Sequence, residues 1–107
     1  MNREYSRGFK MMEIEELKRI LHDHKHELQK EYGIKEIGVF GSYIKRKERS
    51  TSDVDILVEF QEAVDLLTFV HLKNHLTELL KINVDLVMKK ALKPNIGKRI
   101  LDEVVYI

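Results

Sequence analysis

Apolar residues recur with helical spacing in three segments of the 107-residue chain. Residues 12–32 are predicted to form a helix with one buried stripe, which Gly33 is placed to end. That stripe consists of Ile14, Leu17, Ile20, Leu21 and Leu28. A wide apolar face predicts a second long helix over residues 63–81, formed by Leu66, Leu67, Val70, Leu76, Leu79 and Leu80. Because proline suits the first helical turn, Pro94 predicts the start of a closing helix that runs to about residue 101.

Short apolar runs between these segments predict strands over residues 35–40, 53–60 and 82–88, with a last short strand in residues 103–107. In the second strand, alternation places Val54, Ile56 and Val58 on one face and Asp53, Asp55 and Leu57 on the other. Residues 42–47 are expected to form one or two helical turns, followed by a polar loop. The alternation of helices and strands predicts an α/β fold, in which helices pack against a small mixed sheet.

Length and composition indicate one ordinary globular domain. Hydrophobic residues make up 43% of the chain and charged residues 35%. We expect a flexible polar arm over residues 1–11 and a single domain over residues 12–107. A formal net charge of +1 argues against direct nucleic-acid binding. No apolar run predicts a membrane span, and the absence of cysteine fits a cytoplasmic protein.

Two aspartates interrupt the apolar run of the second predicted strand. Alternation places Asp53 and Asp55 on the same face, with their Cα atoms roughly 6.5 Å apart. Asp85 stands in the equally apolar third strand, and it would face the same place if the two strands were neighbours. Carboxylate oxygens in this number suit Mg²⁺, which would compensate their mutual repulsion. A solvent-facing strand end that carries acids without any function is the alternative.

A phosphate-binding turn is predicted where Gly41 and Ser42 follow the first strand. Backbone N–H groups and a helix start favour an anion there, and glycine permits close approach of a phosphate. The pair alone would be an ordinary turn with a helix cap. Together with three carboxylates, however, it predicts metal-assisted transfer from a nucleoside triphosphate.

The segment GSYIKRKERSTSDVDILVEF, residues 41–60, resembles the Gly-Ser and Ser-Asp-X-Asp motif of the DNA polymerase β-like nucleotidyltransferase superfamily. The chain is similar to the minimal nucleotidyltransferase (MNT) branch from about residue 14 to residue 107. This resemblance implies a nucleotidyltransferase fold and an ATP substrate. It implies nucleotide binding by Gly41, Ser42, Lys45 and Ser52. It also implies that Asp53, Asp55 and Asp85 are the catalytic residues and hold Mg²⁺, with Asp85 helping to activate an acceptor hydroxyl.

One part of the motif departs from the family pattern. Members commonly carry Ala-Arg-Gly where this chain has Ile44, Lys45 and Arg46. Lys45 preserves a positive charge, whereas Arg46 replaces a glycine and so changes either the loop or its contact with the nucleotide. Because the three aspartates are intact, activity is still expected.

The resemblance also implies a partner. Small members of this family often pair with a HEPN-domain ribonuclease in toxin–antitoxin systems and transfer AMP from ATP to a tyrosine of the toxin. We therefore expect a protein adenylyltransferase that acts as an antitoxin. The alternatives are a non-catalytic antitoxin that masks its partner, and transfer to a small molecule or RNA, which the short chain disfavours.

The five histidines of the chain lie outside this motif. His71 and His75 have the i, i+4 spacing of a zinc pair, but the glutamate of a zinc-protease motif is missing. A helix surface or partial core is the favoured reading of that pair. His24 is expected to lie on the apolar stripe as a hydrogen-bonded core histidine.

Overall fold

The computed structural model describes residues 13–41 and 53–107. In these ranges the chain forms α1 (Ile14–Tyr32), β1 (Ile34–Phe40), β2 (Val54–Phe60), α3 (Leu66–Leu80) and β3 (Val84–Met88). A 3₁₀ turn η2 (Lys89–Ala91), α4 (Pro94–Glu103) and β4 (Val105–Tyr106) complete it. Within these ranges, the predicted order of helices and strands is confirmed. The expected arm, residues 1–11, and the expected helical turns of residues 42–47 lie outside the described ranges.

The strands form one mixed sheet in the order β3-β2-β1-β4. β1 pairs antiparallel with both β2 and β4, whereas β2 and β3 pair in parallel. A parallel pair requires a long crossover, and α3 supplies it between β2 and β3. The predicted α/β class with a small mixed sheet is therefore confirmed.

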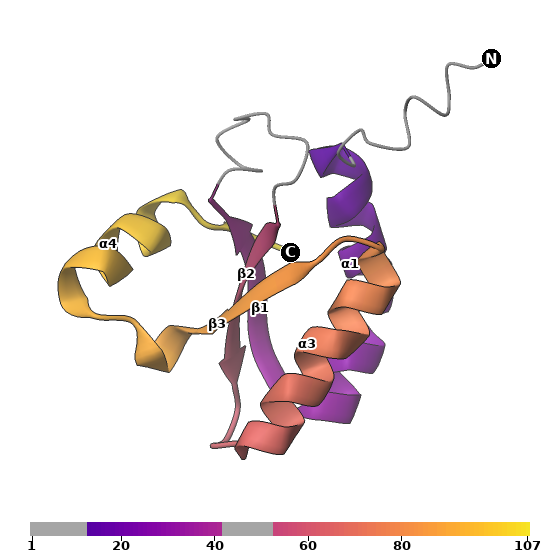
Figure 1. Cartoon of the computed structure of the whole chain (residues 1–107), viewed down its shortest axis with the longest axis horizontal. Helices are drawn as coiled ribbons and strands as arrows, with labels where there is room; N and C mark the ends of the chain where they lie inside the picture. The colour runs from indigo at the N-terminus through magenta and orange to yellow at the C-terminus, as the bar shows by residue number, and fades with distance from the viewer. Residues whose placement is uncertain (1–12, 42–52) are drawn as a thin grey trace.

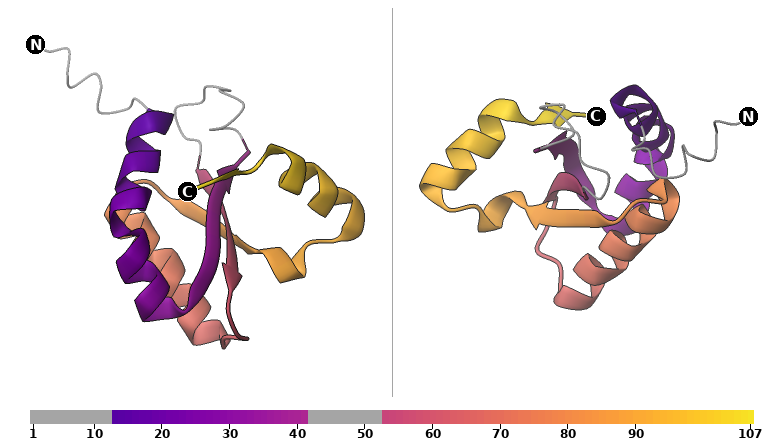
Figure 2. Two further views of the ribbon diagram at one scale, coloured as in Figure 1. Left: turned by 180° about the vertical axis from the view of Figure 1, so that it is seen from behind. Right: turned by 45° about the horizontal axis from the view of Figure 1, so that its top comes forward.

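The helices occupy both sides of the strands (Figures 1 and 2). α1 and α3 pack against each other and against one face of the sheet, while α4 stands on the opposite side. None of the described helices is long and apolar enough to cross a membrane.

Leucines of α1 and α3 form the main core with one face of β2. Val54, Ile56 and Val58 of that face are fully buried, as the alternation predicted. The helices contribute Leu17, Leu21, Leu28, Leu72, Leu76 and Leu80, all buried. This apolar layer fixes the sheet, so the opposite face of β2, which carries Asp55, is directed toward the side of α4.

The expected buried face of α3 was partly wrong. Leu66 and Leu67 are 75% and 64% exposed, and Val70 is also exposed. The helix begins at Leu66 rather than at residue 63, because the Asp65 side chain accepts a hydrogen bond from the Thr68 N–H at 2.8 Å and caps the first turn. Apolar residues in that first turn extend beyond the edge of the core, so the spacing alone overestimated the buried stripe.

The predicted end of α1 at Gly33 and the predicted start of α4 at Pro94 are both confirmed. Gly33 ends α1 with a φ of 69°, and its N–H donates to the Gln29 carbonyl at 2.9 Å. This left-handed conformation is readily accessible to glycine. Pro94 occupies the first turn of α4, where its missing N–H costs nothing.

Candidate active site

The parallel pairing of β2 and β3 brings two of the predicted site residues together. Asp55 lies directly across from Asp85, and Val54 lies across from Val84. Asp53 immediately precedes β2, on the same side as Asp55 by strand alternation. Asp53 and Asp85 are exposed, while Asp55 is half-buried. The condition set by the sequence, that the second and third strands be neighbours, is met.

The carboxyl of Asp55 has an unusual environment. Its pKa is raised from 3.8 to about 6, first because burial penalises the charged form. The charge of Asp85 and a hydrogen bond with the Asp85 carboxyl raise it further, and the charges of Asp53 and Glu103 add smaller effects. Asp55 and Asp85 therefore repel each other as carboxylates, and a proton or a cation between them relieves that repulsion.

Gly41 packs directly against this carboxyl. It follows Phe40, which pairs with Asp55 across β1 and β2. Gly41 has a φ of +81°, and a Cβ atom at this position would collide with Oδ2 of Asp55. Both the backbone conformation and the contact therefore require glycine. Three other predicted nucleotide-binding residues, Ser42, Lys45 and Ser52, lie outside the described residues.

Asn83 and Glu103 are two neighbours of the site that sequence reasoning missed. The amide Nδ2 of Asn83 donates a hydrogen bond to Oδ2 of Asp53 at 3.3 Å. Glu103, the last residue of α4, lies near enough to Asp55 to raise its pKa. The Asn-Val-Asp sequence of residues 83–85 has the same i, i+2 spacing as Asp53 and Asp55, and this signal was available. No sequence signal pointed to Glu103, because only the fold brings α4 to β2.

The donor chemistry of this face fits a divalent cation. Carboxylate oxygens are the ligands that Mg²⁺ prefers, and the crowding around Asp55 favours a positive charge beside it. Within residues 13–41 and 53–107, no group of three or more acidic or histidine side chains is assembled closely enough to hold a metal on its own. Mg²⁺ usually takes only one or two carboxylates and completes its shell with water and substrate phosphates. The aspartates therefore fit a site that the nucleotide completes.

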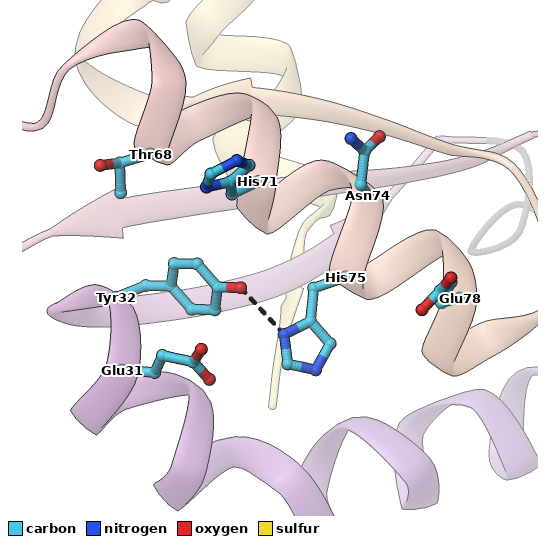
Figure 3. Close-up of a pocket in the computed structure, with 7 residues that line it drawn as sticks. All are labelled: Glu31, Tyr32, Thr68, His71, Asn74, His75 and Glu78. Carbon is cyan, nitrogen blue, oxygen red and sulfur yellow. Dashed lines mark hydrogen bonds between the residues drawn. The ribbon is translucent and has the colours of Figure 1, made fainter.

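An open groove lies on the opposite side of the sheet from the aspartates, between α1 and α3 (Figure 3). This open groove of about 570 Å³ is lined by Glu31, Tyr32, Thr68, His71, Asn74, His75 and Glu78. The Tyr32 hydroxyl lies 2.9 Å from Nδ1 of His75, and the two rings meet edge to face. His71 is exposed. His75 thus links the two helices, in agreement with the structural reading of this histidine pair.

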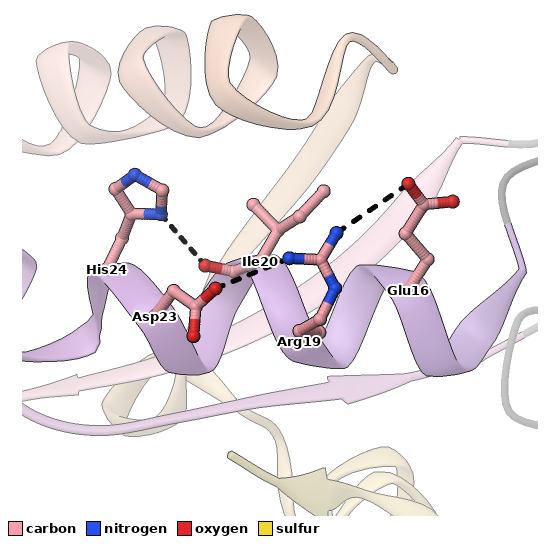
Figure 4. A network of polar contacts seen from close by, with 5 residues as sticks. All are labelled: Glu16, Arg19, Ile20, Asp23 and His24. Carbon is pink, nitrogen blue, oxygen red and sulfur yellow. Dashed lines mark hydrogen bonds and ion pairs between the residues drawn. The ribbon is translucent and has the colours of Figure 1, made fainter.

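His24 is hydrogen-bonded as expected, but it is only partly buried and does not belong to the core (Figure 4). Its partly buried ring lies beside the α1 backbone, where Nδ1 donates to the Ile20 carbonyl at 2.9 Å. On the same helix, Arg19 contacts Glu16 at 3.8 Å and Asp23 at 3.3 Å. These ion pairs are exposed and contribute little stability. The surface of α1 therefore offers neutral positions for control substitutions.

Comparison with known proteins identifies the family of this chain. Residues 15–107 match the family described as polymerase beta, nucleotidyltransferase. The chain is 50% identical over 97 residues to the protein adenylyltransferase MntA of Thermococcus cleftensis, spanning 91% of this chain and 98% of that protein. A Methanocaldococcus jannaschii protein named for the same activity, MJ0128, is 46% identical over 98 residues, or 91% of this chain and 100% of that protein.

Solved structures show the same fold. A minimal nucleotidyltransferase superposes with a TM-score of 0.75 at 33% identity, covering 90% of this chain and 97% of the other. A chain from the Shewanella oneidensis complex of a tri-AMPylated HEPN toxin with an MNT antitoxin gives a TM-score of 0.61 at 21% identity. That match covers 89% of this chain and 71% of the other.

The family match and the named relatives define this chain as a nucleotidyltransferase. This chain belongs to the polymerase β-type nucleotidyltransferase family, as the resemblance predicted, and it resembles the minimal members of that family in length and fold.

Proposed function

We propose that this chain is a Mg²⁺-dependent protein adenylyltransferase that transfers AMP from ATP to a tyrosine of a HEPN-domain ribonuclease toxin, and so acts as its antitoxin. The observation that carries this function is the pairing of Asp55 with Asp85 on neighbouring parallel strands, beside a glycine that admits no side chain. The name of the 50%-identical relative supports the reaction. The AMP-modified HEPN toxin in a structural neighbour supports the class of acceptor.

The triphosphate would be bound at the turn that follows β1. There the backbone of Gly41 packs against Asp55, and the motif assigns Gly41, Ser42, Lys45 and Ser52 to the nucleotide. Lys45 would contribute the positive charge that the usual arginine of the family provides. The segment that carries these three residues joins β1 to β2, and β1 ends and β2 begins beside the carboxylates.

Asp53, Asp55 and Asp85 would hold Mg²⁺. When bound, the ion neutralises charge that develops on the transferred phosphate. Asp55 contributes a half-buried carboxylate that packing holds in place. Asp53 and Asp85 are exposed, so they can reach ligands delivered with the nucleotide.

The transfer itself requires an acceptor oxygen close to the α-phosphorus, at about 3–3.5 Å. The tyrosine oxygen forms a bond to the α-phosphorus, the bond from that phosphorus to the bridging oxygen of the β-phosphate breaks, and diphosphate leaves. Asp85 would accept the hydroxyl proton, a role for which its exposure to an incoming partner is suited. A docked protein loop can deliver such a hydroxyl to an open sheet face.

A cytoplasmic location belongs to this proposal, because the reaction consumes ATP and its acceptor is a ribonuclease. The domain that performs it would span residues 12–107, preceded by the arm of residues 1–11. These boundaries follow from the sequence pattern and from the family match over residues 15–107.

The test is a reaction of the purified protein with ATP, Mg²⁺ and the HEPN protein with which it co-purifies. Intact-mass spectrometry should show the HEPN protein gaining the mass of one or more AMP groups, and fragmentation should place them on tyrosine. Asp85→Asn should suppress the mass increase, whereas Asp23→Asn should not, since Asp23 is an exposed residue of α1 in a surface ion pair.

The opposite outcome would favour masking. If the Asp53→Ala, Asp55→Ala double variant neutralised the toxin as well as wild type, with no change in the mass of the HEPN protein, the protein would act by binding alone. A transfer of AMP to RNA or to a small molecule, with the HEPN protein unmodified, would instead retain the enzyme class and overturn the acceptor.

A further inference from the structure

The start of the β2–β3 ladder places Asn83 across from Asp53. Asp55 pairs with Asp85 and Val54 with Val84, and the Val54 N–H donates to the Asn83 carbonyl at 3.0 Å. Asp53 and Asn83 are therefore the next neighbours along the two strands. Because side chains alternate along a strand, Asn83 lies on the same side of β3 as Asp85, just as Asp53 lies on the same side of β2 as Asp55.

The two cross-strand neighbours differ in chemistry. Asp55 and Asp85 set one carboxyl against another, whereas Asp53 meets an amide. Nδ2 of Asn83 donates to Oδ2 of Asp53 at 3.3 Å. Among residues 13–41 and 53–107, Asn83 is the residue that donates a hydrogen bond to the Asp53 carboxylate. An amide there contributes a donor, where a further acid would add repulsion.

Asp53 needs such a partner more than Asp55 does. It is exposed and immediately precedes β2, so packing does not fix its side chain. A free aspartate side chain would have to be ordered each time a ligand bound, at a cost in conformational entropy. A hydrogen bond from the neighbouring strand removes part of that cost in advance.

We infer that Asn83 is a positioning residue, whose amide holds the Asp53 carboxylate on the face of the sheet shared with Asp55 and Asp85. Asn83 acts through Asp53 and need not touch the nucleotide. The inference deepens the proposed function and rests on it, because it assumes that Asp53 binds the cation that accompanies ATP.

Metal binding tests this role apart from activity. Because the nucleotide completes the metal site, wild type and Asn83→Ala are each saturated with a non-hydrolysable ATP analogue. Mn²⁺, a spectroscopic substitute for Mg²⁺, is then titrated into both, and binding is followed by electron paramagnetic resonance and calorimetry. Mutating the hydrogen-bond partner of a metal ligand typically lowers metal affinity by about 10–100-fold, so Asn83→Ala should weaken Mn²⁺ binding about tenfold. Asn83→Leu, which is similar in size but has no donor, should behave alike. Asn74→Ala, an equal change at an exposed position of α3, should have no effect.

A double-mutant cycle separates positioning from a general structural role. In an Asp53→Asn background, Asn83→Ala should weaken Mn²⁺ binding no further, because the carboxylate it positions is gone. In the AMP-transfer reaction, Asn83→Ala should raise the Mg²⁺ concentration needed for half-maximal rate about tenfold, and excess Mg²⁺ should restore the rate. Melting temperatures of all variants, measured without metal, should stay close to wild type.

Equal Mn²⁺ affinity in wild type, Asn83→Ala and Asn83→Leu would overturn the inference, and so would a loss that adds fully to that of Asp53→Asn. Failure of the proposed function has a different signature. If wild type binds Mn²⁺ with the expected coupling but modifies no HEPN protein, the acceptor is wrong and the positioning role stands. If wild type binds no Mn²⁺, both are overturned.

Discussion

Replacing Asp55 by asparagine should stabilise the metal-free protein at neutral pH, and this gain should vanish in acid. Burial, followed by the charge of Asp85, raises the pKa of Asp55 from 3.8 to about 6. A group with a higher pKa in the folded chain binds protons more tightly there, so its ionisation favours unfolding. The stability contributed by this carboxyl is therefore complete below its ordinary pKa and is lost as the pH rises through about 6.

The size of the effect follows from the two pKa values. Their difference of about two pH units corresponds to at most about 3 kcal/mol in the free energy of unfolding, at 1.36 kcal/mol per unit. Asp55 is only half-buried, so solvent screening reduces this figure to about 1–2 kcal/mol. In a domain of this length, that gain corresponds to a rise in melting temperature of about 5–10 °C for Asp55→Asn.

The assay compares urea unfolding of wild type and Asp55→Asn, in the presence of a chelator, between about pH 4 and about pH 8. The two free energies of unfolding should converge near the acid end and separate as the pH passes about 6. Asp23→Asn makes the same chemical change at an exposed residue of α1, and it should follow wild type at every pH. Mg²⁺ added at neutral pH should stabilise wild type and Asp23→Asn but not Asp55→Asn, and so narrow the difference in stability between wild type and Asp55→Asn.

Two results would refute this reasoning. If wild type and Asp55→Asn differed by a constant amount at all pH values, the Asp55 carboxyl would not be the group whose ionisation is unfavourable. If Asp23→Asn gained as much as Asp55→Asn at neutral pH, the effect would belong to net charge rather than to the crowding of Asp55 and Asp85.

Three further predictions concern the site. Asp53→Ala or Asp55→Ala should lower the rate of AMP transfer roughly a thousandfold or more without loss of secondary structure, because metal stabilisation of the transition state is worth several kcal/mol. A variant that keeps over a tenth of the wild-type rate would remove that residue from the mechanism. In thermal melts with Mg²⁺, wild type should gain stability and the Asp53→Asn, Asp55→Asn double variant should not, whereas equal gains would indicate that the metal binds elsewhere. Gly41→Ala should abolish nucleotide binding measured by calorimetry, since its Cβ would collide with Asp55. Gly33→Ala, which is also at positive φ but in open space, should cost only about 1–2 kcal/mol of stability. Equal nucleotide binding by both variants would contradict the close contact at Gly41.

Local pattern was enough to predict most elements of this fold. The spacing of apolar residues gave the helices and strands to within a few residues, and Gly33 and Pro94 marked two helix ends. Side-chain alternation alone placed Asp53 and Asp55 on one face, because the period of a strand is a property of its own backbone. The structure of segments that depends on residues close together in the sequence could therefore be predicted from the sequence alone.

Contacts between distant segments were decided only by the tertiary structure. The pairing of Asp55 with Asp85 depends on the register of two strands joined through α3, which the packing of that helix on the sheet determines. The approach of Glu103 to Asp55 depends on α4 returning to the opposite face. A sequence identifies the residues that could act in catalysis, but the distances between them depend on how the core is packed. The spacing of residues along the chain does not determine those distances.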